Sequence, residues 1–171
     1  MPNTYTLISS NTVGSSGAST VTFSSIPATY TDLLVKVSSR VDYAATSQAL
    51  LMRFNSSATS YTGKLLRGSG SAASSFASGT TYINLGETVG ATSTTNTFGN
   101  TEIYIPNYTG SNYKSTSSDG TMETNGATSY MELTSGLWSD TAAITSISFS
   151  ASNSSNFVQY STFYLYGINK S

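Results

Sequence analysis

The chain of 171 residues contains neither cysteine nor histidine, and only 9% of its residues are charged. Without cysteine it can form no disulfide framework and has no thiolate chemistry. Without histidine it lacks both the commonest general base and the commonest metal-ligating side chain. These absences argue against most hydrolytic and zinc-dependent mechanisms, and we expect the protein to need no cofactor.

Charge is also too sparse to indicate a nucleic-acid partner. The seven basic residues are scattered along the chain, and the net charge is −1. Phosphate binding relies on clustered Lys and Arg, so we expect no nucleic acid to bind. No apolar run is long enough to span a bilayer, and the N-terminus has neither the cationic start nor the apolar segment of a signal peptide. We therefore expect no membrane association.

Hydroxyl and aromatic side chains take the place of the missing charges. Ser and Thr make up more than a third of the chain, and 12 Tyr and 7 Phe are spread along its length. That aromatic content is too high for a disordered linker. Thr and Tyr suit a half-buried pleated surface. The length fits a single domain spanning residues 1–171.

Short segments that alternate apolar and polar residues recur between clusters of Gly, Asn and Ser, as strands do. In residues 33–41 the odd-numbered residues from Leu33 to Val41 form one face, and the even-numbered residues from Leu34 to Arg40 form the other. In residues 49–54, Leu50, Met52 and Phe54 are expected to face inward, with Leu51 and Arg53 outward. Residues 61–66 fit either a strand or a short helical turn. Further strands are expected at 4–9, 21–23, 49–54, 82–85, 98–106, 111–118, 120–125, 128–134, 143–151 and 159–168.

No segment sustains a helical period, and turn signals come every 8–12 residues or so, which is typical of a β-sandwich or barrel. We predict an all-β, antiparallel sandwich of about eight to ten strands. A jelly roll is favoured over an immunoglobulin-like sandwich, because the Cys…Trp…Cys frame is missing and the chain is longer than that fold needs.

Several loops are expected from local composition. Asp119-Gly120 and Asn125-Gly126 are strong hairpin-turn signals. Ser69 to Gly79 reads as a loop with Phe76 as its only anchor, and residues 86–96 read as a second loop. Gly136 to Asp140 is expected to form a corner that carries the only Trp.

The final strand, 159–168, is unusually apolar for the end of a chain. This is explained if the strand lies inside a sheet and is paired on both sides. Phe163 and Leu165 would then face the core, with Tyr164 and Tyr166 on the outer face. Gly167 would allow a close approach of other groups to the backbone.

Catalytic constellations are not apparent. No Gly-x-Ser-x-Gly elbow is present. Glu102, Glu123 and Glu132 could meet on neighbouring strands as a glycosidase pair would, but strand carboxylates more often form cross-strand ion pairs. Calcium is the metal best matched to so many oxygen ligands, yet no Asp-x-Asp-x-Asp run exists. We predict that the protein is not an enzyme.

Tyrosine supplies the one surface signal. Candidate contact residues are Tyr104, Tyr108, Tyr113, Tyr164 and Tyr166. Tyr is enriched at interfaces because it joins an apolar ring to a hydroxyl group, and its ring also stacks on sugars. The alternative is that these rings serve strand packing and cross-strand pairs. A protein partner and a glycan both remain open.

Four stretches together resemble small virion proteins of tailed bacteriophages: Tyr5-Thr-Leu-Ile-Ser-Ser, the segment 21–33 beginning Val21-Thr-Phe, Ile103-Tyr-Ile-Pro-Asn-Tyr and Ser161-Thr-Phe-Tyr-Leu-Tyr-Gly-Ile. The resemblance covers nearly the whole chain and carries no functional residue set. It implies a β-sandwich exposed on the particle and devoid of enzymatic activity.

Two roles follow from this resemblance. As a capsid decoration, or cement, protein the chain would bind the major capsid protein on the outside of the assembled shell, as a homo-oligomer and specifically a trimer. As a tail-fibre module it would recognise host glycans through exposed Tyr. Decoration is favoured because no coiled-coil or long fibrous segment is present. The protein would be located in the virion after assembly in the host cytoplasm, a reducing compartment that suits a chain without cysteine.

Overall fold

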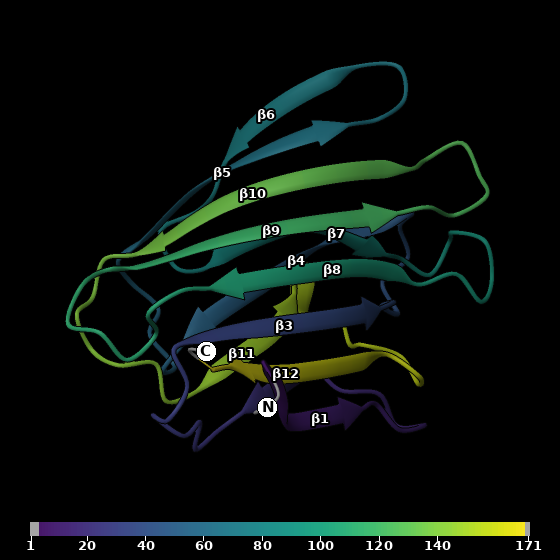
Figure 1. Ribbon diagram of the computed structural model, residues 1–171. Coiled ribbons are helices and arrows are strands. Elements are labelled where there is room, and N and C mark those ends of the chain that lie inside the picture. Colours follow the sequence, from purple (N-terminus) through teal and green to yellow (C-terminus); the bar gives the residue numbers. More distant parts are fainter. Residues whose placement is uncertain (1–3, 170–171) are drawn as a thin grey trace.

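The computed structural model describes residues 4–169, which form two antiparallel β-sheets packed face to face (Figure 1). The larger sheet contains, in spatial order, β1 (Tyr5–Thr12), β12 (Thr162–Ile168), β3 (Asp32–Ser39), β8 (Gly99–Ile105), β9 (Lys114–Met122), β10 (Tyr130–Trp138), β5 (Tyr61–Gly68) and β6 (Ala73–Ala77). The smaller sheet contains β2 (Thr20–Phe23), β11 (Ile147–Ala151), β4 (Ser47–Phe54) and β7 (Ile83–Val89).

The predicted all-β antiparallel sandwich is confirmed. The described residues form twelve strands, more than the eight to ten expected, and one short 3-10 turn at Ser152–Ser154. The strand that lies outside the predicted ranges is β6, whose composition resembles that of a loop. It forms the edge of the larger sheet and pairs with β5 on one side.

The final strand lies inside the larger sheet, as predicted. β12 pairs with β1 on one side and with β3 on the other. Phe163 and Leu165 are fully buried, whereas Tyr164 and Tyr166 lie on the outer face with their rings stacked 6.5 Å apart. An interior strand must be apolar on its core side wherever it falls in the chain, which accounts for the hydrophobic end of this sequence.

Gly167 does provide the close approach expected of it. The ring of Tyr30 covers this position so tightly that a Cβ atom on residue 167 would lie 2.2 Å from Tyr30 Cγ. Tyr30 in turn packs against the core as a partly buried residue. A side chain at position 167 would therefore displace the ring that closes this end of the sandwich.

The apolar core lies between β12, β3 and β8 on one side and the smaller sheet on the other. The alternation predicted for residues 33–37 and 50–54 is confirmed, with Leu33, Val35 and Val37 buried on β3 and Leu50, Met52 and Phe54 buried on β4. Two aromatic groups fill the interior. Phe163 contacts Phe149 and Phe157 with ring centroids 5.5 and 5.0 Å away, and Phe54, Tyr61 and Trp138 form a second group.

Two predicted turns are wrong because glycine has another use here. Asp119-Gly120 lies within β9 and Gly136 lies within β10, so neither marks a turn or a corner. A Cβ on residue 136 would lie 2.7 Å from Ile83 Cγ2, so the glycine admits β7 of the opposite sheet. Asn125-Gly126 does lie between β9 and β10, and Asn125 has the positive φ of such a turn.

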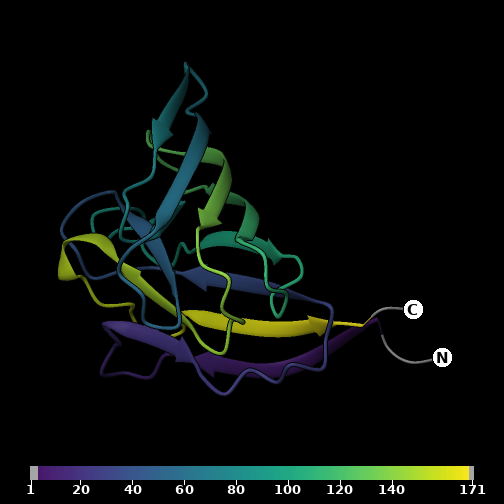
Figure 2. The ribbon, with the colours of Figure 1, turned by 90° about the vertical axis from the view of Figure 1, so that its left-hand side faces the viewer.

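The segment expected to be a loop anchored by Phe76 instead contains β6, and the Phe76 ring is 46% exposed. Residues 61–66 belong to the strand β5, and β7 continues to Val89, so the predicted 86–96 loop begins only at residue 90. β5 and β6 project beyond the rest of the sandwich (Figures 1 and 2), and every residue of β6 is exposed. Ser- and Ala-rich composition concealed a strand whose two faces both meet solvent.

Truncating the final strand's core residue tests its place in the sheet. Leu165→Ala should lower the free energy of unfolding by about 2–5 kcal/mol, the range for a buried leucine, measured by urea denaturation. The matched control is Leu7→Ala on the neighbouring strand β1, where the side chain is half exposed and the loss should be under about 1 kcal/mol. Equal losses at the two positions would contradict the burial described here.

Deleting residues 161–171 should expose the unpaired edges of β1 and β3 and give aggregated protein on size-exclusion chromatography. A soluble, folded truncation would instead show that the segment is a dispensable arm.

Candidate functional site

The outer face of the larger sheet carries a continuous row of apolar and aromatic side chains. Leu7, Tyr166, Leu34 and Tyr104 are register partners in sequence across β1, β12, β3 and β8. Tyr5 and Tyr164 lie on the same face, two residues from this row along their strands. We call these six residues the tyrosine surface.

Hydrogen bonds fix the exposed rim of the tyrosine surface. The Tyr104 hydroxyl donates to Asp32 Oδ2 at 2.8 Å, and this hydrogen bond raises the pKa of Tyr104. Asp32 Oδ1 accepts the backbone N–H of Asn107 at 2.8 Å. Beside the row, Lys36 Nζ lies 2.7 Å from Glu102 Oε2. The Lys36–Glu102 pair is neutral, whereas Asp32 has no cationic partner within residues 4–169, so the rings form an apolar contact area with one carboxylate at its rim.

The structure brings together three of the five predicted contact residues. Tyr104, Tyr164 and Tyr166 lie on one face of neighbouring strands. Tyr108 does not belong with them, because it is fully buried and its hydroxyl donates to the Pro27 carbonyl oxygen. Tyr113 is exposed, but it lies in the segment before β9 and outside the sheet face.

Tyr5 and Leu7 also belong to this surface, but they were not among the contact residues predicted from the sequence. Their alternation in the first strand was visible. Whether Tyr5 and Leu7 join the aromatic face depends on the register in which β1 pairs with β12, and these two strands come from opposite ends of the chain.

The carboxylates serve structure. Glu102 and Glu132 do not meet, because their register partners on β9, Asp119 and Gly120, point to opposite faces of the sheet. Glu123 caps the turn after β9 by accepting the Asn125 N–H at 2.9 Å. Within residues 4–169, no three acidic side chains gather closely enough to hold a metal ion.

A buried ion-pair cluster joins the two sheets. Arg67 on β5 donates from Nε to Glu132 Oε1 on β10 at 2.6 Å, and its Nη2 donates to Glu87 Oε1 on β7 at 2.8 Å. Glu132 Oε2 also accepts the backbone N–H of Glu87 at 2.5 Å. The Arg67 guanidinium lies over the rings of Tyr130 and Phe76, 4.3 and 5.0 Å from their centroids.

Burial dominates the electrostatics of this cluster. The Glu132 side chain is only 2% exposed, and burial raises the pKa of its carboxyl group despite the hydrogen bonds from Glu87 and Arg67. Burial also lowers the pKa of Arg67, but the two carboxylates outweigh it and the net shift is upward. Gly86 has a φ of +102°, and a Cβ there would lie 2.3 Å from Glu132 Oε2. The backbone of β7 is thus shaped to receive the carboxylate.

Two further cations are buried and donate mainly to backbone carbonyl oxygens, with the Thr97 hydroxyl as one additional acceptor. Arg40, expected on the outer face, is buried, and its guanidinium donates to the carbonyls of four residues, Ala91, Ser93, Thr94 and Thr97, at 2.8–3.1 Å. Lys114 donates to the Gly110 and Asn112 carbonyls at 2.7 and 2.6 Å. Burial lowers the pKa of both groups. Each cation organises the loop that supplies its acceptors.

No helix within residues 4–169 has the length and apolar character needed to cross a membrane. Comparison of the chain with protein-family models, with curated proteins and with solved structures gives no match.

Removing the cation of the buried cluster should be costly. Arg67→Met should lower the free energy of unfolding at neutral pH by about 3–5 kcal/mol, because the Glu132 carboxylate is left buried without its counter-charge. The control Lys36→Met breaks the exposed pair with Glu102 and should cost about 1 kcal/mol or less.

The Arg67→Met loss should also depend on pH. The pKa of Glu132 is raised in the folded state, so folding retains a proton that the unfolded chain releases, and stability falls as pH rises through the folded-state value. Losing Arg67 raises that pKa further. The penalty should therefore be smaller in acid than at neutral pH. A loss independent of pH would contradict burial of the charged carboxylate as its cause.

We expect no structural metal. Addition of a chelator should shift the melting temperature by no more than about one or two degrees, because a tightly bound ion would add stability that chelation removes. A larger decrease, reversed by added Ca²⁺ but not by Mg²⁺, would reveal a calcium site.

Proposed function

We propose that this protein is a non-enzymatic virion component that coats a phage capsid by binding the major capsid protein through the tyrosine surface. The observation that carries the proposal is the row of Leu7, Tyr166, Leu34 and Tyr104, which crosses four strands on the outer face beside the neutral Lys36–Glu102 pair. Leu34 itself is only 8% exposed, so the rings and Leu7 supply the accessible contact area. The resemblance of four stretches to phage virion proteins supplies the biological context.

Strand order supports a jelly roll as the core of the fold. Eight strands form two interleaved sets, β1-β12-β3-β8 and β2-β11-β4-β7. Along the chain β1, β2, β3 and β4 alternate between the two sheets, and β8, β11 and β12 alternate again. This is the order that two Greek keys give, and β5–β6 and β9–β10 then extend one sheet. Jelly rolls are common in viral coat proteins, which is an analogy of fold only.

A largely apolar contact area suits a repetitive lattice. Each tyrosine contact contributes modestly, but a shell offers many equivalent sites, so an oligomer that engages several at once gains avidity. We propose a trimer, which matches the three-fold and quasi-three-fold positions of an icosahedral shell and has the closed symmetry usual for oligomers.

The main test is where the protein binds. Tagged protein is mixed with purified virions and with isolated tails, and the label is located by electron microscopy. Label over the whole capsid surface, with hundreds of copies per particle by gel densitometry, is the expected result. Label confined to fibre ends, with a few to a few dozen copies, would overturn the capsid assignment and favour a tail module that stacks Tyr164 and Tyr166 on a glycan.

A second test asks whether the tyrosine surface makes the contact. The double variant Tyr104→Ser with Tyr164→Ser should reduce capsid binding at least about tenfold, in line with the loss of two central aromatic residues from an interface. Tyr160→Ser is the matched control, because Tyr160 is 68% exposed but lies in the segment before β12. Equal loss in both variants would indicate a different contact face.

A further inference from the structure

In β10 several polar or small residues face inward and several large apolar residues face outward, the reverse of an ordinary sandwich strand. Its inner face carries Glu132, Thr134 and Gly136, whereas its outer face carries Met131, Leu133 and Leu137. A shift of one residue in register would exchange the two faces, so this placement is strongly specified by pairing with β9 and β5. The Arg67 cluster explains why Glu132 faces inward, but nothing within residues 4–169 covers the apolar side chains that face outward.

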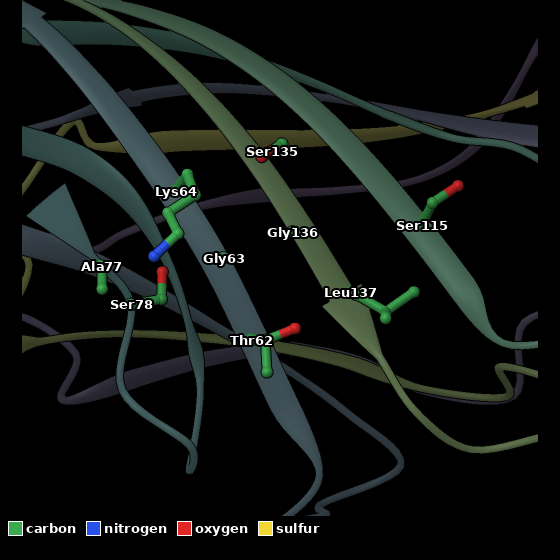
Figure 3. Close-up of a pocket in the computed structure, with 9 residues that line it drawn as sticks. All are labelled: Thr62, Gly63, Lys64, Ala77, Ser78, Ser115, Ser135, Gly136 and Leu137. Atoms are coloured by element: carbon green, nitrogen blue, oxygen red, sulfur yellow. The ribbon is translucent and has the colours of Figure 1, made fainter. Parts of the chain in front are cut away.

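These outward side chains form a compact patch at the opposite end of the outer face from the tyrosine surface. Leu133 on β10 and Leu66 on β5 are register partners and are 57% and 53% exposed, and Met131 beside them is 69% exposed. We call these three residues the leucine patch. Figure 3 shows the adjoining shallow pocket, where Leu137 of β10 and Lys64 of β5 lie on neighbouring strands.

Two opposite charges flank the leucine patch without a partner in the described chain. Lys64 lies two residues from Leu66 on β5, and Asp119 on β9 is the register partner of Leu133. Neither side chain makes an ion pair or hydrogen bond within residues 4–169. Asp119 also faces Glu102 across the strand pair, and Lys36 neutralises only Glu102. A carboxylate beside another carboxylate is unfavourable unless a cation completes the group.

We propose that a second copy of this chain covers the leucine patch through a two-fold symmetric contact. On ideal sheet spacings, Lys64 and Asp119 lie two strands and two residues apart, about 12 Å. A two-fold axis that runs parallel to the sheet just above its outer face, and crosses the line joining the two residues at its midpoint and at right angles, brings Lys64 of each copy over Asp119 of the other. Leu66 and Leu133 then lie close to the axis, on either side of it, and pack against their symmetry mates. The patch is thus self-complementary in charge and in apolar character, as an isologous contact requires.

The size of the patch sets the expected affinity. The face around the patch, formed by the four neighbouring strands β9, β10, β5 and β6 over about seven residues each, covers about 450 Å² per copy. This is below the roughly 800 Å² per partner of a standard-size interface. The dimer should therefore be weak and should form at micromolar concentrations or above. This contact does not depend on the proposed function, and its two-fold symmetry is distinct from that of the proposed trimer.

Sedimentation velocity over a concentration series from about 1 to 500 μM tests the proposal. The expected result is a reversible doubling of mass with rising concentration, from the 17.9 kDa of one chain, or from three times that mass if the proposed trimer is already formed, to twice the starting value. Lys64→Glu and Asp119→Lys should each weaken dimerisation by roughly tenfold or more, because each places like charges together across the contact. The double variant Lys64→Glu with Asp119→Lys should restore it, because the pairs are re-formed with their signs exchanged.

Exposed positions on the same face provide the control. Tyr164→Ser lies on β12, outside the leucine patch, and should leave the dimer unchanged. Because Lys64 and Asp119 are exposed, their variants should fold, and circular dichroism verifies this. A mass that fails to double at any concentration would overturn the proposal, and so would a doubling that the charge exchange fails to restore.

Discussion

A four-stranded sheet cannot cover an eight-stranded one, and this difference in width governs how the molecule is built. Where the two sheets overlap fully, at β12, β3 and β8, the inner face is continuous Leu, Val, Ile and Phe. Toward β9 and β10 the inward residues become Thr, Ser and Gly, and β7 alone lies opposite. At that margin the ion pairs of Arg67 with Glu132 and Glu87 bridge the two sheets. Beyond it, β5 still buries Tyr61 and Leu65 on its inner side, and only β6 has every residue exposed.

The open outer face divides into two regions of different chemistry. Over β1, β12, β3 and β8 it presents aromatic rings beside the Lys36–Glu102 pair and the hydrogen-bonded Asp32, and over β10 and β5 it presents aliphatic side chains beside two charges that have no partner within residues 4–169. The first region offers a partner little beyond flat apolar contact. The second requires a partner with a cation and an anion in fixed places. A single sheet can thus carry two contact surfaces that select different partners.

Alternation in the sequence was enough to predict the sandwich, the inward residues of β3 and β4, and the interior position of the final strand, because those strands bury one uniformly apolar face. It failed where glycine or charge serves a contact between the two sheets. Gly136 admits Ile83, and Glu132 points inward to meet Arg67 from another strand. Neither contact leaves a local signal. Of the tyrosine surface, Tyr104, Tyr164 and Tyr166 were found from composition, whereas Tyr5 and Leu7 required knowledge of which strands pair.

The pairing of β1 with β12 places the two described ends of the chain side by side. Tyr5 is the register partner of Ile168, and the Asn169 N–H donates to the Thr4 carbonyl oxygen at 3.0 Å. Because the two ends are adjacent, a short linker could join them, and the fold depends little on where along the chain the termini lie. A circular permutant that opens at the exposed turn between β5 and β6, near Gly70, and joins residue 169 to residue 4 through a short linker would keep every strand pair described here. In such a molecule the most apolar strand would lie in the middle of the chain.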